Sequence, residues 1–275
     1  MKAFPLAWIL LILAASVSLA GCTHPETNPN TAEMKALLGQ LTASINGDLG
    51  DLKAGIRNNS RSLSTTGLSG QKAEEVLAEN LLHHPWATSS LVISRDGVVI
   101  TAVPGNYSGV VGINLSWQPQ VQTANAGRVP VVSGVFRMAE GFTGISQSYP
   151  VFSPSGEYLG YTDITYTADS LLGRPVGRLT NGTAYTVWVT QTDGTVIYDT
   201  HKEEIGTNLF SDPAYADPAL QQIFTRIVKE QSGSGSYTFH NDNRSGNITK
   251  TAVWGTAGID GAEWRVVVTS GGNAG

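Results

Sequence analysis

The feature that most constrains the fold is a phrase that the chain contains twice, about a hundred residues apart. Residues 95–115 read RDGVVITAVPGNYSGVVGINL, and residues 192–210 read TDGTVIYDTHKEEIGTNLF. Both begin with an Asp-Gly turn, run through an apolar pair ending in Ile, and close on Gly-x-Asn-Leu. A helical segment and three strand-like segments follow each copy. The repeat is too long for a solenoid unit and predicts two copies of one small domain.

The N-terminal segment has the composition of an export signal. Lys2 is the only charged residue before an uncharged run, rich in Leu, Ile and Ala, that ends in Leu-Ala-Gly before Cys22. This ending resembles a lipobox. We therefore expect residues 1–21 to be a lipoprotein signal peptide, Cys22 to be lipidated, and residues 22–33 to be a polar linker. An uncleaved membrane anchor is the alternative, because the run is almost long enough to span a bilayer.

Composition narrows the class of protein further. A formal net charge of −5, with only 14% charged residues, argues against a nucleic-acid partner. Cys22 is the only cysteine, so the chain forms no internal disulfide and its core must hold the fold. No later apolar run approaches membrane-spanning length. We expect an exported protein held at the outer face of the cell membrane by its lipid.

A helical stalk is predicted over residues 34–90. Apolar residues recur at steps of three and four from Met34 to Ile56, the pattern of a helix of roughly 30 residues with one buried stripe. The same stripe would also allow two copies to pair as a homodimer. A second helix fits residues 71–84 and ends at Pro85. Its apolar side is expected to consist of Val76, Leu77, Leu81 and Leu82.

After the stalk the pattern changes to short strands and turns, which predicts an α+β fold. We expect one module over residues 91–172 and a second over 173–270, each an antiparallel sheet with flanking helices, and a tail at 271–275. Short helices are predicted across residues 117–126 and from Asp217 onward. The expected strands are 91–93, 98–100, 131–136, 146–152 and 158–166, and then 185–189, 195–198, 236–239, 250–254 and 264–269.

This order of elements resembles the double Cache sensor domain, in which two PAS-like modules share one long helix. The second module carries the more specific stretches, DGTVIYDT, EEIGTNLFSDPAY, SGSGSYTF, TAVW and EWRVVV. The first is more divergent, in RDGVVITAV, GINLSW and GEYLGYTDI. The resemblance covers about residues 34–270 and implies an extracytoplasmic ligand sensor, with the first module distal from the membrane.

The resemblance also bears on partners. Family members often sit between two membrane helices and drive a kinase or chemotaxis domain. We expect neither a second membrane helix nor an output domain in this chain. The signal would then pass to a separate membrane receptor, kinase or transporter.

The strand GYTDITY, residues 160–166, is the best candidate for a ligand site. Alternation places Tyr161, Asp163 and Thr165 on one face, where a carboxylate beside an aromatic ring could hold an ammonium group. In amino-acid-binding double Cache domains, an Asp on this strand contacts the ligand amine, and the resemblance assigns that role to Asp163. An exposed Asp163 on the solvent side of the sheet is the alternative.

Comparison of the two copies favours the first module as the ligand-binding one. With Gly156 aligned to Gly261, Asp163 falls on Val268, so core is expected to replace the polar pocket in the second module. Amino-acid-binding members also place an Arg at the start of the distal short helix. This chain reads LSWQPQVQ there, with Trp117 present and the Arg missing. The expected ligand is an amine, an amino-acid-like compound or another small polar molecule.

Three more residues are candidates for the same pocket. Phe136 and Tyr149 could line it from neighbouring strands, and Arg137 could supply charge to an anionic ligand. Sheet packing is the alternative for the two aromatic residues, and core packing for Trp117. A solvated surface position is the alternative for Arg137.

Patterns for catalysis and metal binding are weak. The chain has no Gly-x-Ser-x-Gly turn, and His83 and His84 are adjacent, so they point to different faces of a helix. Asp193, Asp199 and Asp212 fall at turns, where Asp bonds to local backbone. We therefore expect no cofactor, no metal and no enzymatic activity. A cell-surface hydrolase is the least supported alternative.

Taken together, these features predict a lipid-anchored sensory protein that captures a small molecule in its first module. The alternative is a structural or interaction module of the cell envelope, in which the pocket is filled. A cavity beside Tyr161 and Asp163 would favour the first hypothesis.

Overall fold

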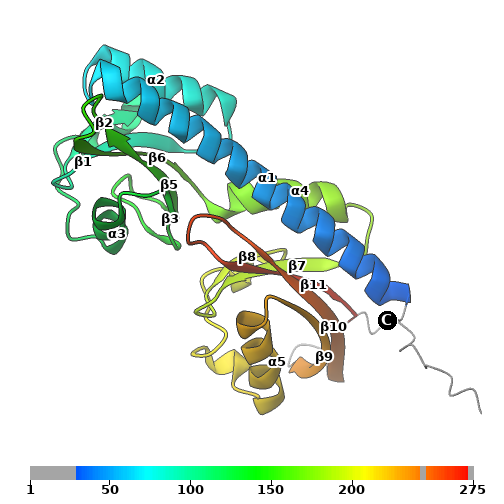
Figure 1. Ribbon diagram of the computed structural model, residues 1–275. Helices are drawn as coiled ribbons and strands as arrows, with labels where there is room; N and C mark the ends of the chain where they lie inside the picture. The colour runs from blue at the N-terminus through cyan, green and yellow to red at the C-terminus, as the bar shows by residue number, and fades with distance from the viewer. Residues whose placement is uncertain (1–28, 242–245, 272–275) are drawn as a thin grey trace, which may run out of the picture.

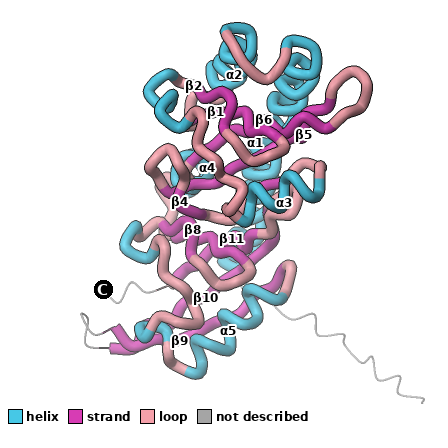
Figure 2. The backbone as a smooth tube through the Cα atoms, turned by 90° about the vertical axis from the view of Figure 1, so that its left-hand side faces the viewer, coloured by secondary structure: helices cyan, strands magenta, loops and turns pink. Residues whose placement is uncertain are grey.

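One long helix runs beside two antiparallel sheets in the computed structural model, which describes residues 29–241 and 246–271 (Figure 1). The two sheets follow one another along the helix, each as a separate module (Figure 2). The architecture is therefore α+β, as predicted. The expected signal peptide, the lipidation site at Cys22 and the last residues of the tail lie outside the described residues.

Helix α1, Pro29–Thr66, forms the stalk and is longer than the sequence predicts. Its apolar stripe from Met34 to Ile56 is buried in a core that both modules share. Gly39, Gly47 and Gly50 are exposed and lower the intrinsic helix propensity, so packing of the stripe stabilises the helix. Because the sheets of the same chain cover this stripe, it is not free to pair with a second copy.

The first module is a sheet with the strand order β2-β1-β6-β5-β3, to which β4 adds a short pairing with β5. Helices α1 and α2 cover one face, and α3 covers the other (Figure 1). The elements are α2 Gln71–His83, β1 Ser89–Ser94, β2 Val99–Val103, η1 Gly105–Val110, α3 Pro119–Gly127, β3 Val131–Val132, β4 Phe136–Arg137, β5 Thr143–Phe152 and β6 Tyr158–Tyr166.

The second module repeats this plan with the strand order β8-β7-β11-β10-β9. Helix α1 packs on one face, and α5 packs on the other. In both sheets the last strand lies beside the first hairpin strand, which confirms the duplication. The elements are β7 Thr186–Gln191, β8 Val196–Asp199, η2 Lys202–Glu204, η3 Pro213–Tyr215, α5 Pro218–Lys229, β9 Ser232–Asn241, β10 Gly246–Ala257 and β11 Trp264–Ser270.

In each copy of the repeated phrase, the Asp-Gly turn at its start is hydrogen-bonded to the Gly-x-Asn-Leu at its end. Gly97 and Gly194 have φ angles of 81° and 89°, a left-handed conformation that strains residues with a side chain. The Gly97 carbonyl accepts a hydrogen bond from the Leu115 N–H at 2.7 Å, and the Gly194 carbonyl accepts one from the Leu209 N–H at 3.0 Å. Each of these leucines is the last residue of its Gly-x-Asn-Leu. The Asn of each copy pairs with the residue after the Gly. These positions are scaffold in both modules.

Helix α4, Ala168–Thr180, joins the modules and is missed by the sequence analysis. The Thr167 hydroxyl caps it by accepting a hydrogen bond from the Ser170 N–H at 3.0 Å. Leu172 and Val176 are buried in the core shared with α1. Pro175 lies inside the helix and hides the helical pattern in the sequence. The expected module boundary at 172/173 falls within this helix.

Three local predictions are wrong. Leu82 is 80% exposed, because the buried side of α2 is formed by Ala73, Leu77 and Asn80. The strand expected over 131–136 is divided into β3 and β4. The Ser133 N–H donates to the Ser146 carbonyl and the Ser133 hydroxyl accepts from the Ser146 N–H, and the chain leaves the sheet after this residue. The helix expected from residue 117 begins at Pro119, a residue whose fixed φ suits the first helical position.

Candidate functional site

Asp163 lies on the central strand β6 and is only 5% exposed. Its carboxylate accepts hydrogen bonds from the Leu91 N–H at 3.0 Å and from the Ser146 hydroxyl at 2.8 Å. Strand alternation turns Tyr161 and Thr165 to the same face, as predicted, and all three line one pocket under α3. The alternative of a solvent-exposed Asp163 is therefore wrong.

A second carboxylate, Glu140, lines the same pocket. It accepts a hydrogen bond from the Ser89 hydroxyl at 2.8 Å, and Ser89 in turn contacts the Thr165 hydroxyl. Among the described residues that line this pocket, none is Lys, Arg or His. The pocket therefore holds two acids and no basic side chain to balance them.

The surroundings of Asp163 disfavour its charged form. Burial, and after it the nearby Glu140 carboxylate, raises the pKa of Asp163 from its ordinary value of 3.8 to about 7. The hydrogen bonds from Ser146 and Leu91 oppose this rise. Burial, together with the nearby Asp163, also raises the pKa of the Tyr161 phenol. An ammonium group beside Asp163 would favour the ionised form of this carboxyl group.

The pocket is small in this conformation, with a volume of about 20 Å³. That space holds about one water molecule. The start of α3 covers it on one side through Gln118 and Val121. The hairpin that follows β3 covers it on the other through Phe136, Met138 and Glu140. A ligand larger than ammonium requires this hairpin or the start of α3 to move.

The sequence places three candidate residues incorrectly. Trp117 is 70% exposed in the turn before α3, and the buried Gln118 lines the pocket in its place. Tyr149 lies on the opposite face of β5, against the core under α1. Arg137 is exposed on β4 and does not line the pocket, whereas its neighbour Phe136 does, as predicted.

Glu140, Gln118 and Ser146 line the pocket but are absent from the sequence prediction. Ser146 could have been found, because it stands at the start of an expected strand next to the one that carries Asp163. Glu140 lies outside any predicted element, so no sequence pattern marks it, and Gln118 lies in the helix predicted over residues 117–126, where the pattern does not single it out.

Strand register corrects the expected equivalence of Asp163 and Val268. Leu91 pairs with Asp163, and its counterpart in the second hairpin, Trp188, pairs with Val267. Val267 faces α5, whereas Val268 faces α1. A shift of one residue exchanges the faces of a strand, so Val267 is the true equivalent. The carboxylate is still replaced by an apolar residue at this position.

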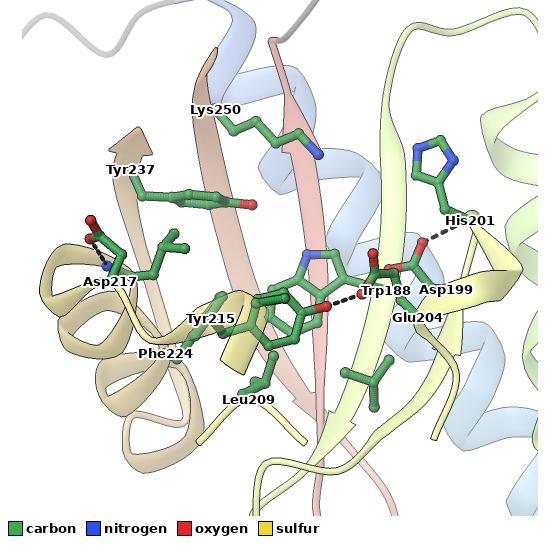
Figure 3. A pocket seen from close by; sticks show the side chains of 13 residues that line it. Trp188, Asp199, His201, Glu204, Leu209, Tyr215, Asp217, Phe224, Tyr237 and Lys250 are labelled. Atoms are coloured by element: carbon green, nitrogen blue, oxygen red, sulfur yellow. Dashed lines mark hydrogen bonds between the residues drawn. The ribbon is translucent and has the colours of Figure 1, made fainter. Parts of the chain in front are cut away.

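The second module nevertheless has a cavity of its own, of about 350 Å³, between α5 and the sheet (Figure 3). The expectation that core fills this module is therefore wrong. Asp199, His201 and Glu204 line it and come from the middle of the second copy of the repeated phrase. Asp199 accepts the expected local bond, from the His201 N–H at 2.6 Å, but it also faces this cavity.

The described part of the chain contains neither a cluster of metal ligands nor a membrane-spanning helix. Within residues 29–241 and 246–271, no three His, Cys, Asp or Glu side chains gather closely enough to hold a metal ion. None of the helices in these ranges is long and apolar enough to cross a membrane.

The first module, which holds the buried polar pocket, is similar to a known family of sensor domains. Residues 47–168 match the family described as "HK/GC/Chemotaxis protein-like, sensor domain". This match covers the second half of α1, all of α2 and the first module. By sequence, the more specific motifs lie instead in the second module. No curated protein matches the chain.

Solved structures with the same fold are sensor domains. An extracellular ligand binding receptor from Desulfohalobium retbaense is 28% identical with a TM-score of 0.75, over 87% of this chain and 40% of that one. This chain therefore spans less than half of that receptor. The periplasmic sensory domain of the Campylobacter jejuni chemoreceptor Tlp1 is 14% identical with a TM-score of 0.64, over 88% of this chain and 95% of that one.

A third structure is the ligand-binding domain of the Pseudomonas aeruginosa amino acid chemoreceptor PctB with L-Arg. It is 13% identical with a TM-score of 0.62, over 87% of this chain and 94% of that one. At such identities the likeness shows the fold alone. Together the matches agree with the resemblance to Cache-type sensor domains, since both the family model and the solved structures are described as sensor or ligand-binding domains.

Proposed function

We propose that the protein is an extracytoplasmic sensory protein that binds a small amine in its first, membrane-distal module. The observation that carries this proposal is the pair of carboxylates at Asp163 and Glu140, which share one pocket without a basic side chain. A ligand ammonium group would supply the missing positive charge through charge-assisted hydrogen bonds. The PctB structure, which is named for its complex with L-Arg, supports small-molecule binding by this fold.

Ligand entry requires the pocket to open. The hairpin after β3 holds Phe136, Met138 and Glu140 over Asp163. It is anchored to β5 by a short pairing of Phe136 with Gly144 and of Arg137 with Thr143. A two-residue strand pair is a weak attachment, so the hairpin is the element expected to move. Its closure over the ligand would be the structural change that a partner detects.

The direct test is a thermal-shift screen of primary amines, amino acids and matched carboxylates. A ligand that binds the folded state raises the melting temperature by mass action. We expect amines to raise it in the wild type and not in Asp163→Asn, which removes the charge and keeps the side-chain shape. Asp51→Asn, an exposed carboxylate on α1, is the matched control and should respond like the wild type. If Asp163→Asn keeps the amine response, the proposed site is wrong.

Attachment through Cys22 and signalling through a separate partner belong to the same proposal. The lipobox-like ending before Cys22 supports the anchor. Cys22→Ala should leave the protein in the soluble fraction of cells, whereas the wild type should be in the membrane fraction. Crosslinking in intact cells, with and without an amine that binds, would then identify the partner. A membrane-bound Cys22→Ala variant would contradict the lipid anchor.

One observation favours a second candidate function. The small volume beside Asp163 agrees with a pocket that is filled by the chain itself, as in an interaction module of the cell envelope. On that hypothesis no small molecule changes the melting temperature. The thermal-shift screen therefore separates the two functions.

A further inference from the structure

A cavity that belongs neither to the Asp163 pocket nor to the proposed function lies in the second module. Its volume of about 350 Å³ is in the range of small-molecule sites. The cavity lies between β7–β8, α5 and the strands β9–β10 (Figure 3). Native interiors contain few voids larger than a water molecule. A hollow of this size, with polar side chains along it, therefore has the features of a binding site.

Aromatic and apolar side chains form one wall of this cavity. Phe224 of α5 is at the centre of the wall, with ring centroids 6.1 Å from Trp188, 5.6 Å from Tyr215 and 6.3 Å from Tyr237. The contacts with Trp188 and Tyr215 are edge-to-face and the contact with Tyr237 is tilted, and such ring contacts fix the rings in place. They present ring faces and edges to a ligand, and ring faces attract organic cations.

Acidic groups form the opposite side. Figure 3 shows Asp199 and Glu204 together on the β8 side of the cavity, across from Tyr237. Glu204 accepts a hydrogen bond from the Tyr215 hydroxyl. Asp199 accepts one bond, from the backbone N–H of His201. The structure shows no hydrogen bond to its other oxygen from any described residue, so that oxygen is available to a ligand.

The remaining charged groups do not cancel these acids. Asp217 lines the cavity, but its carboxylate caps α5 by accepting from the N–H groups of Ala219 at 2.7 Å and Leu220 at 3.2 Å. Lys250 and His201 are the basic groups on the rim. Burial is the main cause that raises the pKa of Asp199 to about 6, and His201 and Lys250 oppose this rise. Three acids, Asp199, Glu204 and Asp217, thus line the cavity together with these two basic residues.

We propose that this cavity is a second ligand site, separate from the one at Asp163, and that it binds an organic ammonium ion with an apolar body. The ammonium group would lie against Asp199 and Glu204, and the apolar body against Trp188 and Phe224. This site goes beyond the proposed function, because it gives the membrane-proximal module a ligand of its own. Neither site contributes a lining residue to the other.

The test is isothermal titration of the full mature chain with phenethylamine, and with 3-phenylpropionate as the isosteric anion. Phenethylamine should bind the wild type, and 3-phenylpropionate should not. Asp199→Asn should weaken phenethylamine binding about tenfold or more through loss of a charge-assisted bond. Asp163→Asn should retain this binding event, which separates failure of this proposal from failure of the proposed function.

A second variant, Ala214→Trp, tests the site independently in case Asp199→Asn does not fold. Ala214 lines the cavity from an exposed turn, so Ala214→Trp should fill the space without removing a charge. It should abolish phenethylamine binding while circular dichroism stays unchanged. The proposal is overturned if phenethylamine does not bind, if its affinity is unchanged in Asp199→Asn, or if its binding is lost only in Asp163→Asn.

Discussion

Each module has one acidic residue on a strand of its sheet, and the two acids lie on the same face of the same scaffold but on different strands. In the first module, Leu91 of β1 lies between Asp163 on the central strand β6 and Ala102 on the edge strand β2. All three positions face the layer that contains α3. The acid is therefore at the centre of the sheet.

In the second module the arrangement is reversed. Trp188 of β7, the equivalent of Leu91, lies between Val267 on the central strand β11 and Asp199 on the edge strand β8. The acid is therefore at the edge of the sheet, where the segment after β8 leaves room for a cavity of about 350 Å³. Duplication preserved the scaffold and moved the carboxylate across one strand. A central acid lies in a nearly closed pocket, whereas an edge acid faces an accessible one.

The largest expected effect comes from Val267→Asp, which gives the second module the central acid of the first. Val267 pairs with Trp188 on one side and Trp254 on the other, whereas Asp163 has Ser148 and Ser146 on its neighbouring strand. A buried carboxylate without a polar partner should lower the free energy of unfolding by about 4–5 kcal/mol. Urea denaturation measures the change.

Val267→Thr is the matched control, since it keeps the side-chain shape and adds only a hydroxyl. It should cost well under half as much as Val267→Asp. Equal stability of Val267→Asp and the wild type would mean that the two central positions have similar surroundings, which would contradict the comparison.

The next largest effect is a pH dependence of stability from Asp163. Its pKa is 3.8 when unfolded and about 7 when folded, so the folded state binds more protons between these values. Stability should therefore fall as pH rises from about 4 to 7, by at most roughly 4 kcal/mol, and Asp163→Asn should remove this fall. Asp199, with a pKa of about 6, contributes in the same direction but less. Urea midpoints across this pH range test the prediction, and a stability that rises through the window in the wild type would refute it.

The sequence predicts the scaffold well because its signals are local. The Asp-Gly turns, the alternation in β6 and the stripe of α1 depend on neighbours along the chain. They place Asp163 and Tyr161 on one face correctly. The register between the modules is wrong by one residue, because Gly156 and Gly261 belong to turns of different length.

The remaining features depend on tertiary contacts that no local pattern records. Glu140 reaches Asp163 from an irregular hairpin, and helix α4 contains Pro175. Asp199 has the local backbone bond of an ordinary turn residue, which conceals its place in a cavity. The two halves of each pocket come from segments far apart in the sequence.

A smaller effect is expected from Ser146→Ala, which removes the hydroxyl that donates to Asp163. Loss of a hydrogen bond to a buried charged group should cost about 2 kcal/mol above pH 7. The cost should be smaller near pH 4, where Asp163 is protonated in both variants. The measurement is urea denaturation at the two pH values, with Ser148→Ala as the control, because Ser148 bonds to the Val131 carbonyl and not to Asp163. A cost that is the same at both pH values would show that the Ser146 hydroxyl does not act on the charge.

The smallest effect compares the helices that cover the two pockets. Asp217 caps α5 through its carboxylate, whereas Gln118, at the same position before α3, makes no side-chain cap. Asp217→Ala should therefore cost about 1 kcal/mol, while Gln118→Ala should have no capping cost. Amide hydrogen exchange in the first turn of each helix measures the difference directly. Faster exchange is expected only in α5, because the Asp217 carboxylate accepts from two N–H groups of its first turn, whereas Gln118 makes no side-chain cap that the substitution could remove. Equally faster exchange in both helices would mean that the N-termini of α3 and α5 are stabilised in the same way, which would contradict the comparison.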